Sequence, residues 1–292
     1  MDGITTRQFK ILSDHMDVYR FMTEIYRKDW GNGVPAPFFE YALSSSWMDK
    51  SYIHRNRIWM ENHRIVGFCF TENPVNDILF SLRPGYEELA DEMVTYASEF
   101  MPKPGSKNRL IIFKGQKAIM ETATRAGYKK ANEFEDMIFD FGEELNYELP
   151  KGFHFVKAED INVDKVSECC WKGFDHEEEE GPWDGDAEHN YHLLQAPHAT
   201  PQYQVVIAND KEEYVCFAGM WWTPENNLAY MEPLCTIPEY RGQGLAAAAL
   251  SCMYRKMKAL GATHMTGGDI DFYKKIGYKP MIPWSIWERN DK

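Results

Sequence analysis

Two glycines, Gly242 and Gly244, stand directly before an apolar run whose spacing predicts a helix over residues 246–260. The first N–H groups of a helix have no partners within it, and the peptide dipoles add about half a positive charge at that end. Glycine has no Cβ, so an anion can approach the backbone closely. We therefore expect the N–H groups of residues 243–247 to bind a diphosphate, with Arg241 adding one positive charge.

The run from Pro238 to Ala246 resembles the acetyl-CoA signature of the GCN5-related N-acetyltransferase (GNAT) superfamily. That signature is Arg or Gln, two residues, Gly, one residue, then Gly or Ala, and Arg241, Gly244 and Ala246 satisfy it. Residues 272–278, Phe-Tyr-Lys-Lys-Ile-Gly-Tyr, resemble the second marker of the family and stand in its order and spacing. The Walker and three-glycine nucleotide motifs, by contrast, are absent.

The resemblance implies acetyl-CoA as cosubstrate and direct transfer of its acetyl group to an amine in a ternary complex. Tyr273 matches the family's acid, which protonates the leaving thiolate; the alternative is that Tyr273 packs under the CoA chain and water is the donor. Glu232 lies on the strand that opens for the pantetheine arm, and either takes the amine proton or only binds the ammonium group. The residues implied to bind the cofactor are Leu234, Cys235, Thr236, Arg241, Gly242, Gln243, Gly244, Leu245, Ala246 and Ala247.

Two departures from a plain cofactor site are visible. Thr266 stands where many family members carry an Asn that touches the cofactor, so that contact is not implied here. Residues 175–188 hold eight carboxylates and no Lys or Arg. They either help to hold a cationic acceptor, together with Trp183 and Trp221, or form a solvated acidic loop.

The elements that must position these residues form a weak internal repeat. Residues 124–130 resemble residues 274–280, and both halves continue the match upstream with a strand pair, a third strand and a helix. The predicted fold class is α/β of the α+β type. It comprises two tandem GNAT-like domains, 1–148 and 149–292, each with a mixed, mostly antiparallel central sheet flanked by helices.

The first copy lacks the phosphate loop. The equivalent stretch, residues 81–89, has one glycine followed by Glu87 and Glu88. Carboxylates at that site repel a diphosphate. We therefore interpret the first domain as degenerate and structural; the alternative is a functional CoA site of unusual sequence.

Composition narrows the functional classes. The chain has 292 residues and a net charge of −13, which argues against nucleic acid or an anionic membrane as partner. Neither a signal peptide nor a membrane span is recognisable, and the six cysteines form no C-x-x-C pair, so we expect a cytoplasmic protein with reduced thiols and no metal site. A buried spectator thiol is the expectation for Cys235. The oligomeric state stays open between monomer and homodimer.

These observations predict an acetyl-CoA-dependent N-acetyltransferase that acts on a primary amine of a small, cationic acceptor. Two alternatives stay open. One is a non-catalytic acyl-CoA-binding sensor or scaffold, and the other is a protein-lysine acetyltransferase, which needs a shallow groove in place of an enclosed cleft.

Overall fold

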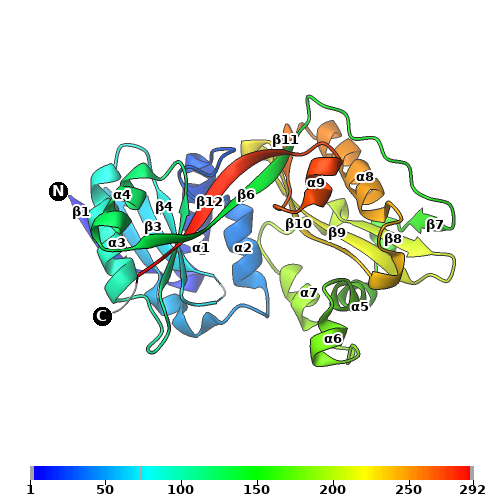
Figure 1. The fold of residues 1–292 in the computed structure, drawn as a ribbon, viewed down its shortest axis with the longest axis horizontal. Coiled ribbons are helices and arrows are strands. Elements are labelled where there is room, and N and C mark those ends of the chain that lie inside the picture. Colours follow the sequence, from blue (N-terminus) through cyan, green and yellow to red (C-terminus); the bar gives the residue numbers. More distant parts are fainter. Residues whose placement is uncertain (1–2, 73, 290–292) are drawn as a thin grey trace. The chain divides into compact units, whose positions relative to one another are not determined.

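The computed structural model describes residues 3–72 and 74–289, which form two compact units (Figure 1). The first unit comprises Met1–Leu43, Trp47–Asp136 and Pro280–Lys292, and the second comprises Ser44–Ser46 and Met137–Lys279. Each unit has its own hydrophobic core. No helix in the described ranges has both the length and the apolar character that crossing a membrane requires.

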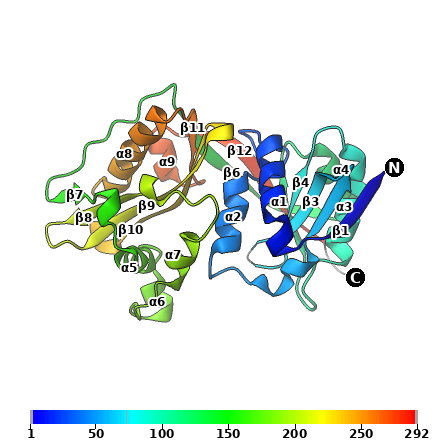
Figure 2. The same ribbon diagram turned by 180° about the vertical axis from the view of Figure 1, so that it is seen from behind.

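All twelve strands belong to one sheet, and its part in the first unit has the order β1-β2-β3-β4-β5-β12. Neighbouring strands are antiparallel except β4 and β5, which are parallel. Helices α1 and α2 lie on one face and α3 and α4 on the other (Figures 1 and 2). The elements are β1 (Ile4–Gln8), α1 (Ile11–Ile25), α2 (Ala36–Ser44), β2 (Arg57–Glu61), β3 (Arg64–Thr71), β4 (Asp77–Leu82), α3 (Ala90–Glu99), β5 (Arg109–Phe113), α4 (Lys117–Arg125) and β12 (Lys279–Glu288).

The part of the sheet in the second unit has the order β6-β11-β10-β9-β8-β7, and only β10 and β11 are parallel. Helices α8 and α9 lie on one face, and α5, α6 and α7 on the other (Figure 1). The elements are β6 (Lys129–Asp140), of which only residues 137–140 belong to this unit, β7 (Phe153–Phe155), α5 (Val163–Gly173), α6 (His176–Glu180), α7 (Glu188–Leu193), β8 (Val205–Asn209), β9 (Tyr214–Thr223), β10 (Leu228–Thr236), α8 (Leu245–Ala259), β11 (His264–Thr266) and α9 (Asp271–Lys275).

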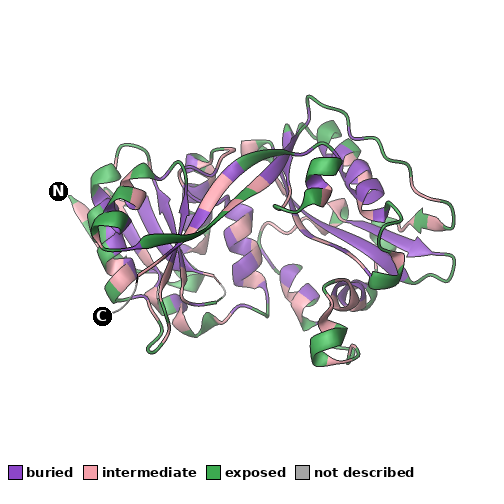
Figure 3. Cartoon of the chain, viewed as in Figure 1, coloured by how far each residue is buried: buried purple, intermediate pink, exposed green. Residues whose placement is uncertain are grey.

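Helices on both faces explain the composition of the central strands. Nine of the ten residues of β9 are buried, so the strand is an almost continuous apolar run without the alternation of a sheet that faces water on one side. The same burial is visible along β8 and β10 (Figure 3). Helix α8 buries a stripe that includes Leu250, Met253 and Met257 at helical spacing, with exposed Arg255 and Lys258 away from it.

The repeated element order confirms the predicted fold class, but the last strands of the two copies are exchanged. β6 follows α4 of the first copy, yet its end pairs with β11 of the second unit from Ile138 to Asp140. β12 follows α9 of the second copy, yet it pairs with β5 of the first unit along Trp284 to Glu288. The compact units divide the chain differently from the expected division after residue 148, because β12 and the end of β6 each pair with a strand from the other half of the sequence.

Candidate active site

Strand β10 carries a bulge at Glu232 and Pro233. β10 has one more residue than β9 between the pairs that flank this point, at Met231 and Leu234. Gly219 of β9 lies opposite the bulge, and a Cβ there would stand 2.1 Å from the carbonyl oxygen of Glu232. Glycine is thus required for the close approach of the two strands. A bulge redirects side chains out of the regular ladder, and this one involves the predicted catalytic carboxylate.

β10 and β11 diverge beside the bulge. They are parallel and pair only at their beginnings, ending with Ala229 opposite Met265. Thr266 closes the ladder, since its buried Oγ1 accepts a hydrogen bond from the N–H of Met231 at 2.8 Å. Along residues 232–236 of β10, no pairing with β11 is present in the described chain. The Thr266 side chain therefore accepts a backbone hydrogen bond at the point where the two strands separate.

The glycine loop leads directly into α8. Gly242 and Gly244 have φ of 75° and 85°, the left-handed region that side chains with a Cβ disfavour. A Cβ built on either residue meets no atom within 4 Å, so the space in front of the loop is open. Gly244 is the N-cap of α8, and no side chain caps the helix. The start of α8 therefore has the geometry that anion binding needs.

Arg241 fastens this loop to the neighbouring elements. Its guanidinium donates to the carbonyl oxygens of Thr236 at 3.1 Å and Gly173 at 2.9 Å. It also forms an ion pair with Asp175 at 2.8 Å. The charge of Arg241 is thus shared with a carboxylate, and the side chain connects the end of β10 to the end of α5.

Tyr273 lies close to the place where β10 and β11 separate. It belongs to α9, is buried, and packs against Tyr278 with ring centroids 5.1 Å apart. Gly267 follows β11 directly, and a Cβ there would stand 2.8 Å from the Tyr273 ring. Burial raises the pKa of the Tyr278 hydroxyl well above its usual value, and the neighbouring Tyr273 raises it further. The hydroxyl of Tyr278 therefore stays protonated.

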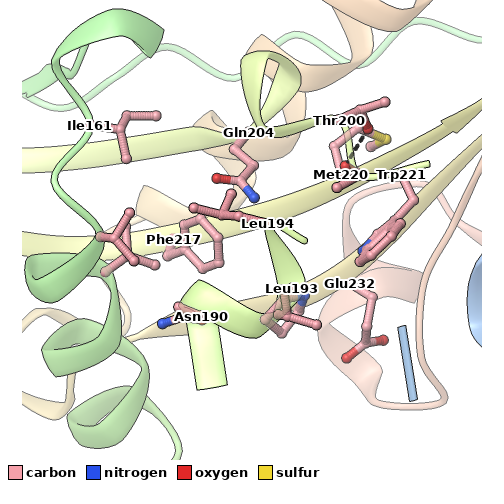
Figure 4. Close-up of a pocket in the computed structure, with 14 residues that line it drawn as sticks. Ile161, Asn190, Leu193, Leu194, Thr200, Gln204, Phe217, Met220, Trp221 and Glu232 are labelled. Carbon is pink, nitrogen blue, oxygen red and sulfur yellow. Dashed lines mark hydrogen bonds between the residues drawn. The ribbon is translucent and has the colours of Figure 1, made fainter. Parts of the chain in front are cut away.

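A hollow opens on the face of the sheet that α5 and α7 cover, and Glu232 lies at one end of it (Figure 4). Trp221 lies beside Glu232, and Ile161 and Phe217 lie toward the opposite end (Figure 4). The residues that line the hollow are Ile161, Val163, Val166, Asn190, Leu193, Leu194, Ala199, Thr200, Gln204, Phe217, Met220, Trp221, Glu232 and Pro233. Glu232 and Pro233 thus connect the bulge of β10 with an apolar cavity.

The acidic segment 175–188 does not contribute to this lining. Glu177 through Glu180 are exposed on α6, and the indole N–H of Trp183 donates to the carbonyl oxygen of Asp186 at 3.1 Å. Of the two tryptophans considered for the acceptor, the structure brings only Trp221 to Glu232. Within the described ranges, no group of three or more His, Cys, Asp or Glu side chains is placed to hold a metal ion.

The cysteines near the site are buried thiols. Sγ of Cys235 donates to the carbonyl oxygen of Cys169 at 3.7 Å and lies 4.0 Å from Sγ of Cys170. Burial raises the pKa of Cys216 to about 12. A Cβ on Gly173 would stand 2.7 Å from Cβ of Cys235, so the end of α5 packs directly on β10.

In the first unit the chain itself bridges the corresponding strands. The side chain of Gln116 is buried and bridges the diverging strands, since it donates to the carbonyl oxygen of Phe80 at 2.6 Å and accepts from the N–H of Phe113 at 3.0 Å. The carbonyl oxygen of Asn32 accepts from the N–H of Leu82 at 2.9 Å, so another segment continues the ladder of β4.

The helix entrance of the first unit is also different. The carboxylate of Glu87 accepts a hydrogen bond from the N–H of Gly85 at 3.0 Å. This backbone donor of the loop is therefore already bound to an acidic side chain. Asp91 and Glu92 stand in the first turn of α3. Negative charge at this helix end disfavours a further anion.

Residues 168–278 match the sequence model of the acetyltransferase (GNAT) family. The matched segment, residues 168–278, is a GNAT-family sequence. No curated protein sequence matches it. The segment that matches the family begins in α5 and ends at Tyr278, so it contains the bulge, the glycine loop and Tyr273.

Solved structures of other GNAT proteins share the fold over the full length. A GCN5-related N-acetyltransferase from Sphaerobacter thermophilus is 11% identical with a TM-score of 0.62, and the match covers 99% of this chain and 96% of that one. A tandem GNAT protein from the clavulanic acid biosynthesis pathway gives 11% identity, a TM-score of 0.62 and 99% coverage of both chains. A GNAT-family acetyltransferase from Colwellia psychrerythraea is 12% identical with a TM-score of 0.61, covering 98% of this chain and 100% of that one.

The predicted tandem fold is therefore confirmed, whereas the individual site residues stay predictions. Several of the positions described above carry no motif. Gly219 is one, although a glycine inside a strand is a recognised signal of a bulge. Gln116 and the hollow-lining residues of α7 gave no signal, because their neighbours become known only once the chain is folded.

Proposed function

We propose that the second unit transfers the acetyl group of acetyl-CoA to a primary amine by direct attack. The observation that carries this proposal is the common location of three features along β10. These are the bulge with Glu232, the separation from β11, and the uncapped helix start that follows Gly244.

Acetyl-CoA fits the open glycine loop. Its diphosphate would accept from the N–H groups of Gln243 to Ala247, where no side chain occupies the helix start. The pantetheine arm would lie along the backbone of Leu234, Cys235 and Thr236, which lacks a strand partner on the β11 side in the described chain. The thioester would then arrive near the bulge.

The chemistry requires one proton to leave the amine and one to reach the sulfur. Glu232 would take a proton from the ammonium group, and the neutral nitrogen would attack the thioester carbonyl carbon. The carbon–sulfur bond breaks as the amide bond forms, and Tyr273 would donate its proton to the departing thiolate. The products are the N-acetylated amine and CoA, with no covalent enzyme intermediate.

The test is release of CoA thiol from acetyl-CoA in the presence of primary amines. We expect Tyr273→Phe to lower kcat by about a hundredfold, the lower range for loss of a general acid, while KM for acetyl-CoA changes little. Tyr191→Phe removes a hydroxyl from an exposed tyrosine and is the matched control. Tight CoA binding without turnover of any amine would instead support the acyl-CoA sensor.

Glu232→Gln separates the two roles of this carboxylate. Loss of a base lowers kcat and removes the acidic limb of its pH profile. Loss of an ammonium ligand raises KM for the amine and leaves kcat unchanged. Glu179→Gln, on the exposed face of α6, is the control and should change neither constant.

A further inference from the structure

The hollow beside Glu232 has a chemical character that limits what the enzyme can acetylate. We infer that the acceptor is a monoamine with a compact apolar group, which lies in the hollow while its amino group meets Glu232. This inference rests on the proposed function and adds the class of acceptor to it.

The lining is mostly apolar. Among the described residues that form it, ten are hydrophobic and Glu232 is the charged one. The hydrophobic members come from the sheet, as Phe217 and Trp221 do, and from the helical face, as Val166 and Leu193 do. Binding of an apolar group against such a surface is favourable, by about 25 cal/mol for each Å² of apolar surface removed from water.

Three uncharged polar residues belong to the lining, Asn190, Thr200 and Gln204, and the side chains of the first two are engaged with the protein. Thr200 donates to the carbonyl oxygen of Met220 at 2.7 Å and accepts from the N–H of Trp222 at 3.1 Å. The amide of Asn190 donates to Ser167 at 2.7 Å. A sugar acceptor would bury hydroxyl groups with few partners, and each unsatisfied polar group costs about 1–3 kcal/mol.

A polyamine is disfavoured for the same reason. Its second ammonium group would need another carboxylate within the hollow, and the acidic residues of segment 175–188 lie outside the lining. A buried charge without a partner is strongly unfavourable. One amine and one apolar group therefore match the single carboxylate and the hydrophobic walls.

The size of the hollow favours a small apolar group. It encloses about 30 Å³, whereas about 10–15 Å³ suffices for one water molecule. A short alkyl chain fits this space, and a larger ring requires movement of residues such as Leu193 or Leu194 from α7 and its end.

The experiment measures kcat/KM for a series from methylamine to hexylamine, with spermidine and glucosamine for comparison. Burial of one CH₂ corresponds to about a fourfold gain, so we expect kcat/KM to rise by that factor per carbon and then to fall. Both comparison amines should be at least tenfold poorer than the best alkylamine. Efficient use of spermidine or glucosamine, without a response to alkyl length, would refute the inference and leave acetyl transfer intact.

Variants of the lining locate the effect. Leu194→Trp fills the hollow from a partly exposed position and should move the optimum to a shorter amine. Leu193→Ala enlarges it and should move the optimum to a longer one. Leu260→Trp changes an exposed leucine outside the lining and should leave the optimum where it is. An unchanged optimum in both lining variants would contradict the inference.

A binding measurement decides the inference even without turnover. The melting temperature of the protein with CoA present is recorded against the same alkylamines. Stabilisation that increases with chain length and is lost in Leu194→Trp supports an apolar amine site, although absent turnover would refute the proposed transferase. No stabilisation by any alkylamine, together with no turnover, refutes both.

Discussion

At the scale of single residues, the geometry around the proposed reaction centre depends on a few short contacts. Thr266 illustrates this, because its hydroxyl accepts the N–H of Met231 where two parallel strands separate. The side chain that the family resemblance left without a role thus fixes one edge of the opening. Its neighbour in sequence, Gly267, leaves room for the ring of Tyr273.

Thr266→Val replaces this hydroxyl by a methyl group of similar shape. We expect a loss of about 1–3 kcal/mol in unfolding free energy, because a buried N–H is left without its acceptor. KM for acetyl-CoA should rise as the edge of the opening becomes less defined. Thr266→Ser keeps the acceptor and should behave nearly as the parent in denaturant unfolding and in kinetics. Equal losses in both variants would show that the hydroxyl is not the cause.

At the scale of elements, the bulge of β10 depends on its partner strand. Gly219 has no positive φ, so its requirement for glycine comes from the backbone of Glu232 and not from its own conformation. The bulge in turn decides that Glu232 reaches the hollow. Two strands that are ordinary in composition thereby form the end of the proposed acceptor site.

Gly219→Ala should force β9 and β10 apart. Backbone atoms cannot yield as a flexible side chain does, so we expect a loss of about 1–3 kcal/mol in unfolding free energy and a larger fractional loss of amine turnover. Gly142→Ala meets only a carboxylate oxygen of Asp140 and is the matched control. Thermal unfolding and thiol release measure the two effects. Wild-type turnover in Gly219→Ala would mean that the bulge does not position Glu232.

At the scale of the whole molecule, β12 and the end of β6 each pair with a strand from the other half of the sequence. β12 contributes Trp287 to the core of the first unit, where it packs with residues such as Leu110 and Ile119. Its indole N–H donates to Ser285 at 2.8 Å. The last strand of the sequence therefore stabilises the domain that the N-terminal residues begin.

Trp287→Ala should weaken the first unit in particular. Removal of a buried Trp costs about 3–5 kcal/mol. Hydrogen exchange resolved by peptide should become faster in β4 and β5, with less change in β8 to β10 of the second unit. Faster exchange confined to the second unit would contradict the assignment of β12 to the first core.

The two units should also differ in cofactor binding. We expect one acetyl-CoA per chain in a calorimetric titration, because Gln116 and Glu87 occupy the equivalent positions in the first unit. Gly244→Asp places a carboxylate and a strained φ at the start of α8 and should abolish the binding. A remaining site in Gly244→Asp, or a stoichiometry of two, would assign a cofactor site to the first unit.

The sequence by itself determined the local features: the glycines before α8, the apolar strands of a sheet flanked by helices, and the repeated element order. These depend on neighbouring residues, so their patterns are readable along the chain. Only the tertiary structure decided that Gln116 bridges β4 and β5 in the first unit and that α7 lines the hollow next to Glu232. It also decided that β6 and β12 are exchanged, because partners far apart in sequence are chosen by packing and leave no periodic signal.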